Sequence, residues 1–138
     1  MSKTTLDSIK NRVSANAFDT SKPLGKADIE ELVSYALEAP SAFDIQHARF
    51  IAVVDPAQKE KLKALSWGQQ KVADAAVTFI VLGDTLAHEK LPDLLGRAVE
   101  AGVFEQGVAD YLVKGAAGFY SDYSNERLVR DEVIRSAS

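Results

Sequence analysis

The sequence predicts an α+β fold in which roughly five or six helices pack around a small sheet. Two runs rich in β-branched and aromatic residues, 49–55 and 76–84, have the length of strands. The other segments carry helical spacing of apolar residues or helix-capping residues. Because an isolated pair of strands is marginally stable in water, these two strands need helices or further strands packed on them.

The first third of the chain predicts two helices separated by an irregular stretch. Residues 3–12 can form a short helix, and residues 14–25 are irregular. Residues 26–39 form an amphipathic helix, which Pro40 ends because the residue before a proline is pushed out of the helical region. The apolar face of this helix consists of Ile29, Leu32, Val33, Ala36 and Leu37.

The middle of the chain predicts strand, helix and strand. The run at 49–55 is continuously apolar and predicts a buried strand. Asp55 is then a candidate N-cap, with Pro56 at the first helical position. Residues 68–75 are a short turn or helix, and 76–84 predicts a second buried strand.

The rest of the chain predicts helices only. One covers residues 86–101, where Pro92 starts or kinks it, and another covers 103–118. The last covers 124–138, with Ser124 as candidate N-cap. We expect its apolar face to lack cover within this chain, and the chain to be either an unusual complete fold or one missing its C-terminal part. This face consists of Leu128, Val129 and Val133.

Composition narrows the class of protein. The chain has 138 residues, 46% hydrophobic and 26% charged, which suits one globular domain over residues 1–138. A net charge of -4 without a basic stripe argues against nucleic-acid binding. The chain has no cysteine, and its two histidines lie far apart, so we expect no metal site. Without an apolar run of about 20 residues or a signal-peptide pattern, we expect a cytoplasmic protein outside the membrane.

Three polar motifs stand in a fixed order along the chain. "NRVSANAFD" lies near the N-terminus, "APSAFDIQHARFIAVVD" precedes the first strand, and "WGQQKVADAAVTFIVLGD" contains the second. The first motif contains Arg12, Ser14 and Asn16. The second contains the helix-ending Pro40 and the polar residues Ser41, Asp44 and Gln46, and the third contains Gln69. In this order and spacing they resemble the FMN-dependent nitroreductase family, and the resemblance spans about residues 6–138.

The resemblance implies a fold, a reaction and partners. The fold would be nitroreductase-like, with helices around a small antiparallel sheet of which only the first two strands are present. The eight motif residues above would bind FMN, and electrons would pass from NADH or NADPH through the flavin to a nitro compound, a quinone or a related acceptor. The family is normally a homodimer with flavin at the interface. No catalytic protein residue is implied, because the flavin carries the electrons.

The residue types suit FMN. A guanidinium such as that of Arg12 makes charge-assisted bonds to phosphate. The hydroxyls of Ser14 and Ser41 can donate to phosphate or ribityl oxygens. The amides of Gln46 and Gln69 offer a donor and an acceptor each, which matches the polar edge of the flavin ring.

Each motif residue also has an ordinary structural interpretation. Arg12 can answer the dipole at a helix end, and Ser14 can form a turn or an N-cap. Ser41 and Asp44 fit a turn after a helix, and Gln69 fits a surface position. His47 is expected to be a satisfied, partly buried histidine rather than a catalytic one. The aromatic residues expected in the core or in dimer packing are Trp67, Phe119, Tyr120 and Tyr123.

Two substitutions and the length depart from the family pattern. Asn16 stands where the family usually has a basic residue, so a cationic contact is lost. Asp44 stands where the family usually has asparagine, and its carboxylate would oppose negative charge on the flavin. The family's later strands and its late phosphate contact are absent from these 138 residues. We therefore expect a C-terminally truncated domain, with a flavin-free interaction or dimerisation module as the alternative function.

Overall fold

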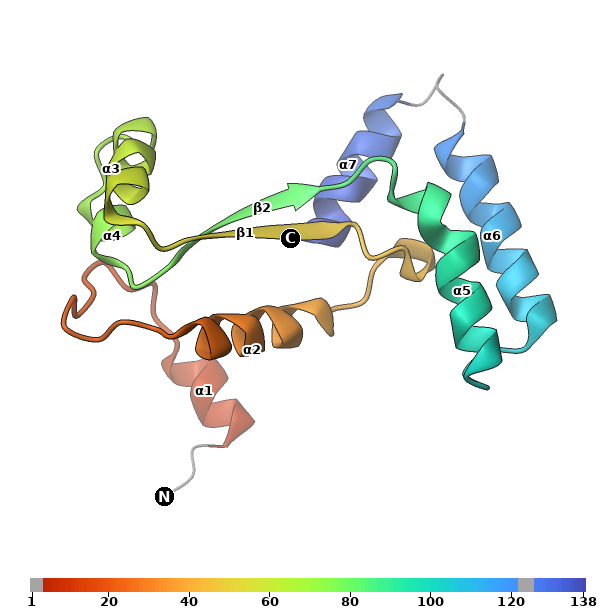
Figure 1. The fold of residues 1–138 in the computed structure, drawn as a ribbon, viewed down its shortest axis with the longest axis horizontal. Helices are drawn as coiled ribbons and strands as arrows, with labels where there is room; N and C mark the ends of the chain where they lie inside the picture. Colours follow the sequence, from red (N-terminus) through yellow and green to blue (C-terminus); the bar gives the residue numbers. More distant parts are fainter. Residues whose placement is uncertain (1–3, 122–125) are drawn as a thin grey trace. The chain divides into compact units, whose positions relative to one another are not determined.

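The computed structural model describes residues 4–121 and 126–138, which fall into two compact units (Figure 1). The first unit comprises Met1–Gly25 and Val53–Thr78, and the second comprises Lys26–Ala52 and Phe79–Ser138. The candidate N-cap Ser124 and the aromatic Tyr123 lie outside the described residues.

Two helices of the first unit begin at side-chain caps. Helix α1 (Thr5–Asn11) follows Thr4, whose side chain accepts from the Asp7 N–H while the Asp7 carboxylate accepts from the Thr4 N–H. Helix α3 (Pro56–Leu65) follows Asp55, whose side chain accepts from the Gln58 N–H, and Pro56 begins the helix. The predicted cap at Asp55 is thereby confirmed.

A buried lysine joins α3 to the end of the short helix α4 (Gln70–Asp74). The side chain of Lys59 is buried, and its Nζ donates to the Ala75 carbonyl at 2.6 Å. Ala75 is the C-cap of α4, where carbonyl groups lack intrahelical donors and the helix dipole favours a cation. The lysine therefore closes α4 and fixes α3 beside it.

The two predicted strands are confirmed, but their predicted burial is wrong. Strands β1 (Ala48–Val53) and β2 (Thr78–Gly83) form a two-stranded antiparallel sheet (Figure 1). Ile51, Val81 and Leu82 are each nearly half exposed. The described residues therefore leave part of the sheet's apolar surface without cover, and both of its strands are edge strands.

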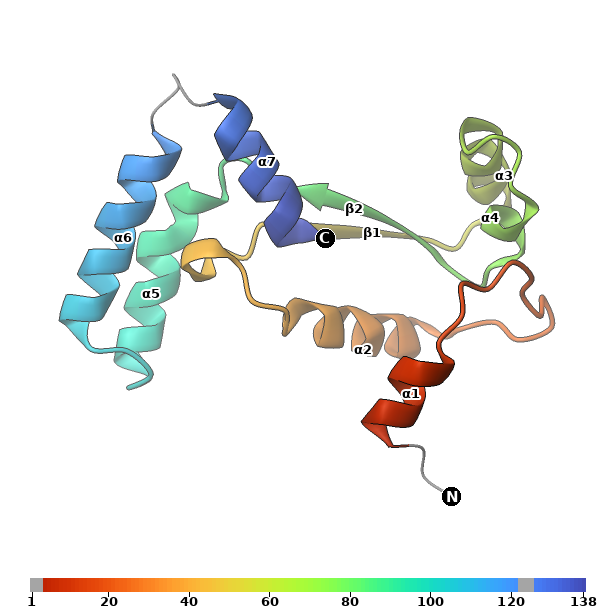
Figure 2. The same ribbon diagram turned by 180° about the vertical axis from the view of Figure 1, so that it is seen from behind.

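The core of the second unit forms between short and long helices that follow β2. A 3₁₀ helix, η2 (Ala87–Lys90), leads into α5 (Leu91–Glu100), which lies beside α6 (Gln106–Tyr120), as Figures 1 and 2 show. Pro92 stands in the first turn of α5 and therefore starts the helix without kinking it. The buried core residues are Ile45, Ala87, Leu91, Leu95, Ala109, Ala116, Tyr120 and Val133.

The last helix, α7 (Glu126–Ala137), is better covered than its sequence suggests. Val133 is buried in the core and Val129 packs against it, so the expectation of an uncovered face is wrong for both. Leu128 remains 47% exposed. The covering groups come from the helices before α7, a long-range packing that periodicity within the helix does not reveal.

The amphipathic face of helix α2 (Lys26–Leu37) is covered only in part. Ile29 and Val33 are half-buried, whereas Leu32 and Leu37 are 47% and 41% exposed. The helix predicted over 26–39 is confirmed, and the exposed leucines mark a surface that this chain leaves open.

We expect Gly83→Ala to lower the free energy of unfolding by about 1–3 kcal/mol, because added volume at a packed contact forces neighbouring groups apart. A Cβ at Gly83 would overlap the Val133 side chain and lie 3.3 Å from the Val133 carbonyl oxygen. Gly96→Ala in α5 is the control, since a Cβ there meets nothing within 4 Å and the helix gains about 1 kcal/mol of propensity. Urea denaturation of both variants measures the difference, and equal stabilities would contradict this packing.

Candidate functional site

The loop between α2 and β1 holds an unusual backbone. It contains the 3₁₀ turn η1 (Ala42–Asp44), and Phe43, Asp44 and Gln46 have left-handed φ angles of 55°, 56° and 59°. Such angles are uncommon outside glycine and asparagine, and each stores strain that surrounding contacts must hold. Left-handed residues concentrated in one short segment make this loop a candidate ligand site.

Side chains of the loop bond to one another. The Ser41 Oγ accepts from the Gln46 N–H at 2.9 Å, which closes the loop across five residues. The Gln46 Nε2 donates to the Asp44 Oδ1 at 2.7 Å. Ser41 therefore keeps its own hydroxyl proton for a ligand, and Gln46 keeps its amide oxygen. Pro40 is exposed at the start of the loop.

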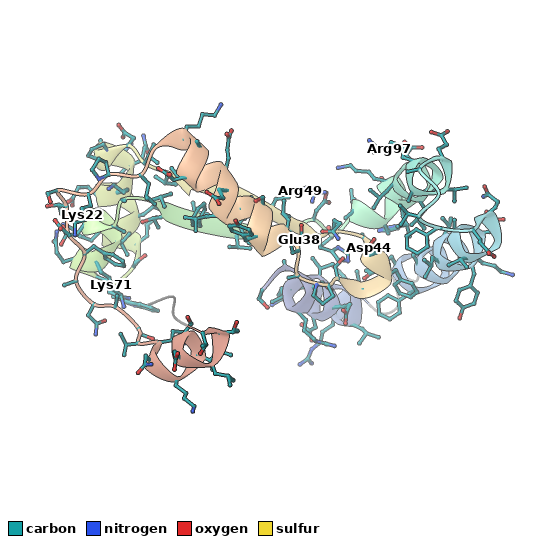
Figure 3. All side chains as sticks on the ribbon, turned by 90° about the horizontal axis from the view of Figure 1, so that it is seen from below. Lys22, Glu38, Asp44, Arg49, Lys71 and Arg97 are labelled. Atoms are coloured by element: carbon teal, nitrogen blue, oxygen red, sulfur yellow. The ribbon has the colours of Figure 1, made fainter. Side chains whose placement is uncertain are left out.

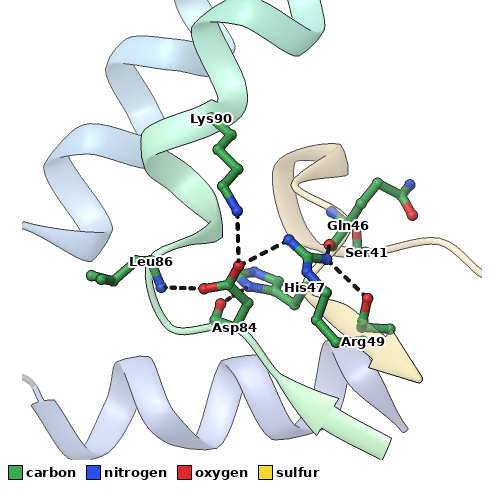
Figure 4. Close-up of polar contacts among 8 residues, drawn as sticks. Ser41, Gln46, His47, Arg49, Asp84, Leu86 and Lys90 are labelled. Atoms are coloured by element: carbon green, nitrogen blue, oxygen red, sulfur yellow. Dashed lines mark hydrogen bonds and ion pairs between the residues drawn. The ribbon is translucent and has the colours of Figure 1, made fainter. Parts of the chain in front are cut away.

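Arg49 of β1 ties the loop to the segment after β2 (Figure 4). Its Nη1 donates to the carbonyls of Gln46 at 2.6 Å and Ala48 at 2.9 Å, and its Nη2 donates to the Asp84 carboxylate at 2.9 Å. Arg49 and Asp44 both belong to the second unit, and Figure 3 labels them. Sequence reasoning missed Arg49, although a cation one residue into a strand that follows a polar motif was a usable signal.

The carboxylate of Asp84 accepts hydrogen bonds from three groups around it. Its carboxylate accepts from the Leu86 N–H at 3.0 Å and pairs with Arg49 and, at 3.4 Å, with Lys90. Burial alone would raise the pKa of Asp84, but the Leu86 N–H and the two cations outweigh it and lower the pKa below its usual value. The carboxylate is therefore charged at neutral pH and holds the guanidinium in place.

His47 is fully buried between the loop and α6. Its Nδ1 lies 3.0 Å from the Asp84 carbonyl oxygen and its Nε2 lies 3.0 Å from the Tyr120 hydroxyl. A carbonyl can only accept, so Nδ1 carries the proton and Nε2 accepts from Tyr120. His88 also stacks on the Tyr120 ring, with centroids 5.1 Å apart. The prediction of a satisfied histidine is confirmed, and its burial is complete.

Burial, followed by the negative charge of Glu132, raises the pKa of Tyr120 to about 12. Between about pH 10 and 12 the folded chain keeps this proton while the unfolded chain loses it, so the stabilising contribution is full below pH 10 and declines above it. We expect the difference in unfolding free energy between the parent and Tyr120→Phe to shrink over this pH range. Absorbance at the tyrosinate band checks that one of the four tyrosines ionises late. A constant difference would contradict the assignment.

A cavity of about 440 Å³ opens beside the loop. Ser41 and Gln46 contribute to its wall, together with Ser136 of α7. Most of the remaining wall is apolar and comes from α2, the sheet and α7, including Leu37, Phe50, Val81 and Ile134. An apolar cavity with a few polar groups on its wall has the character of a ligand site.

The predicted residues of the first unit lie just after α1 and just before α4, and a hydrogen bond joins the two segments. Arg12 is the exposed C-cap residue of α1, and Ser14 is exposed two residues later. Asn16 accepts from the Nζ of Lys71 at 3.3 Å, which brings a cation to the position where a basic residue was missing. Gln69 is half-buried at the N-cap of α4 without a side-chain capping bond.

The structure thus divides the predicted residues between the two units. It brings Ser41, Asp44 and Gln46 together in the second unit, and it joins Asn16 to Lys71 in the first. Trp67 is 94% exposed, so it lies outside the core of this chain and its alternative role in dimer packing stays a prediction, whereas Phe119 and Tyr120 pack in the core as predicted. The left-handed backbone of Trp67, φ 52°, turns its side chain outward after α3.

Comparison with known proteins places the chain in a family. A sequence profile of the Nitroreductase family matches residues 9–137. The chain is 35% identical over 130 residues to a Bacillus subtilis protein named "Putative NAD(P)H nitroreductase MhqN", covering 94% of this chain and 63% of that one. It is 25% identical over 130 residues to the CLA biosynthesis enone reductase of Lactiplantibacillus plantarum, covering 93% of this chain and 60% of that one. The chain belongs to the nitroreductase family.

Solved structures agree on the fold. The crystal structure of the nitroreductase-type protein ydfN of Bacillus subtilis superposes with a TM-score of 0.82 at 34% identity, covering 94% of this chain and 62% of that one. A nitroreductase-type protein of Exiguobacterium sibiricum, solved in complex with FMN, gives a TM-score of 0.87 at 24% identity and covers 99% of this chain and 65% of that one. The nitroreductase-like α+β fold is confirmed, and the chain spans less than two thirds of the length of these relatives.

The described residues also bear on two other kinds of site, a metal centre and a membrane span. Among residues 4–121 and 126–138, no three histidine or acidic side chains gather as metal ligands would. No helix in the described part of the chain has the length and apolar character needed to cross a membrane.

Proposed function

We propose that the protein is an FMN-dependent oxidoreductase that passes electrons from NADH or NADPH to nitro compounds, quinones or related acceptors. The observation that carries the proposal is the strained loop at 41–46, where Ser41 keeps a free hydroxyl proton beside an apolar cavity. Strain of this kind persists at ligand sites, because preorganised groups bind without a further ordering penalty. Membership of the nitroreductase family supports the same chemistry.

The groups of the first unit suit the phosphate of FMN. Arg12 is exposed and offers a planar guanidinium, which can bond a phosphate through two N–H groups. Lys71 lies beside Asn16 and offers a second cation, so the charge missing from the motif is supplied from α4. Ser14 adds a hydroxyl donor. Together these groups match a dianion with several acceptor oxygens.

When bound, FMN supplies two-electron chemistry, and the protein residues bind and orient it. Ser41 and Gln46 would donate to and accept from the polar groups of the flavin, and Gln69 would do the same from α4. No protein nucleophile is needed. We further propose a single nitroreductase-like domain, a homodimer with flavin at its interface, and a cytoplasmic location.

The test is whether the purified protein binds FMN. We expect a yellow protein whose flavin absorbance is bleached by NADH or NADPH under argon and restored by a nitroaromatic, a quinone or an enone. The enone is included because one relative is named an enone reductase. Free FMN mixed with the same acceptors, without protein, is the control. A colourless protein that takes up no FMN at millimolar concentration would reject the proposal.

A flavin-free interaction module is the second candidate, and exposed apolar side chains favour it. Trp67 is 94% exposed and Leu65 is 82% exposed, both at the end of α3. Large apolar groups gathered on a surface indicate association with another protein or another copy. Association of the protein in sedimentation experiments, without any uptake of FMN, would support this candidate over the enzyme.

We expect Asp44→Asn to tighten FMN binding by up to about fivefold and to raise the flavin midpoint potential. Asp44 is exposed, and a charge pair near 4 Å in water is worth about 1 kcal/mol. The asparagine oxygen can still accept from Gln46 Nε2, so the loop keeps its internal bond. Redox titration of both proteins measures the shift, with Asp93→Asn at an exposed position of α5 as a control for net charge. A lower potential in Asp44→Asn would contradict the argument.

A further inference from the structure

We infer that Ser136 and Glu132 of α7 are positioning residues for the loop at 41–46, and so set its affinity for flavin. The inference rests on the proposed function and adds residues outside all three sequence motifs. Ser136 is far from the loop in the sequence, but its Oγ accepts from the Ala42 N–H at 3.2 Å. That bond joins the C-terminal helix directly to η1.

The hydroxyl of Ser136 is itself held by a charged group. It donates to the Glu132 Oε1 at 3.0 Å, one helical turn earlier, while it accepts from Ala42. A hydroxyl that donates to a carboxylate is polarised and becomes a better acceptor. Arg135 pairs with the same carboxylate at 3.0 Å, which keeps Glu132 in place. Arg135, Glu132 and Ser136 thus form a chain of polar contacts that ends at the Ala42 N–H of the loop.

The loop needs such support because it is strained at three positions. Ala42 directly precedes Phe43, the first of the left-handed residues. Ser41 closes the loop from inside, and Arg49 holds the Gln46 carbonyl at its far end. Ser136 supplies the hold at the near end. With both ends fixed, the Ser41 hydroxyl and the Gln46 side chain stay on the wall of the cavity.

The packing of Phe43 shows why the bond between Ala42 and Ser136 is important for the position of Ser41. Its ring packs between α6 aromatic residues, with centroids 6.4 Å from Phe119 and 6.3 Å from Tyr120. This packing fixes the ring, and the Ser41–Ala42 peptide before it is held at both of its polar groups: its carbonyl accepts from the Asp44 N–H at 3.0 Å, and its N–H donates to Ser136. Loss of the Ser136 bond would remove the hold of α7 on this peptide and leave the bond within the turn, so Ser41 would be held less firmly.

The experiment combines hydrogen exchange without flavin with FMN titration. In Ser136→Ala we expect the Ala42 amide to exchange about 3- to 10-fold faster, and FMN to bind about 3- to 10-fold more weakly, the effect of losing one hydrogen bond. Ser136→Thr keeps the hydroxyl and should restore both values. Glu132→Gln should give intermediate values. Ser34→Ala is the matched control, because the Ser34 hydroxyl donates to the Glu31 carbonyl within α2 and Ser34 is not among the residues of the cavity wall.

The two readouts separate this inference from the proposed function. If the Ala42 amide exchanges faster in Ser136→Ala than in the parent and neither protein takes up FMN, the enzyme proposal is rejected. The role of Ser136 in positioning the loop is then still supported. Weaker FMN binding with unchanged exchange at Ala42 would overturn the inference, because Ser136 would then act as a direct contact in the cavity. Unchanged exchange and unchanged binding would overturn it as well, as would equal effects of Ser34→Ala.

Discussion

Arg12→Ala is expected to weaken FMN binding by about 10- to 150-fold. A hydrogen bond to a charged group contributes roughly 1.5–3 kcal/mol, and the guanidinium can make two such bonds to one phosphate. Arg12 is exposed at the C-terminal end of α1, so its removal leaves the core intact. Titration of FMN into the parent and the variant, followed by flavin fluorescence, measures the ratio of dissociation constants.

Two controls distinguish a phosphate contact from a general effect of charge. Riboflavin lacks the phosphate, so its affinity should be nearly equal in the parent and in Arg12→Ala. Arg127→Ala removes a cation that is 94% exposed on α7 and should leave FMN binding unchanged. If Arg12→Ala and the parent bind FMN with the same dissociation constant, the assignment of Arg12 is wrong.

His47→Leu is expected to lower the free energy of unfolding by about 2–4 kcal/mol. Leucine fills a similar volume but leaves the buried Tyr120 hydroxyl without its acceptor, and an unsatisfied buried polar group costs about 1–3 kcal/mol. The bond to the Asp84 carbonyl is lost too, although that carbonyl still accepts from the Ala87 N–H at 3.3 Å. Urea denaturation of the flavin-free protein measures the change.

A double-mutant cycle with Tyr120→Phe tests whether the two side chains act as a pair. Tyr120→Phe alone leaves the His47 Nε2 without a donor, whereas the double variant removes both polar groups and leaves neither unsatisfied. We therefore expect the double variant to be more stable than the sum of the single effects predicts, by about 0.5–3 kcal/mol. Additive effects would contradict the tautomer and the bond assigned to His47.

The local elements were predictable because their signals are local. Residues within a few positions of each boundary predict the elements: Asp55 caps α3, Pro56 begins it, and Pro92 stands in the first turn of α5. The same holds for the two strands. The motif residues were predictable through the family pattern, which the match over residues 9–137 supports. These sequence signals extend over one helical turn or one strand. Burial depends in addition on residues that are distant in the sequence.

What only the tertiary structure decided is which distant groups meet. Ser136 reaches Ala42 across 94 positions, His47 reaches Tyr120 across 73, and Lys71 reaches Asn16 across 55. No spacing rule connects such residues, since the path of the chain between them sets the contact. For the same reason the two strands are half exposed here, although they are apolar enough to be predicted as buried. The sequence of a segment determines its conformation and its preference for burial. Whether the segment is buried depends on the residues that surround it in the fold.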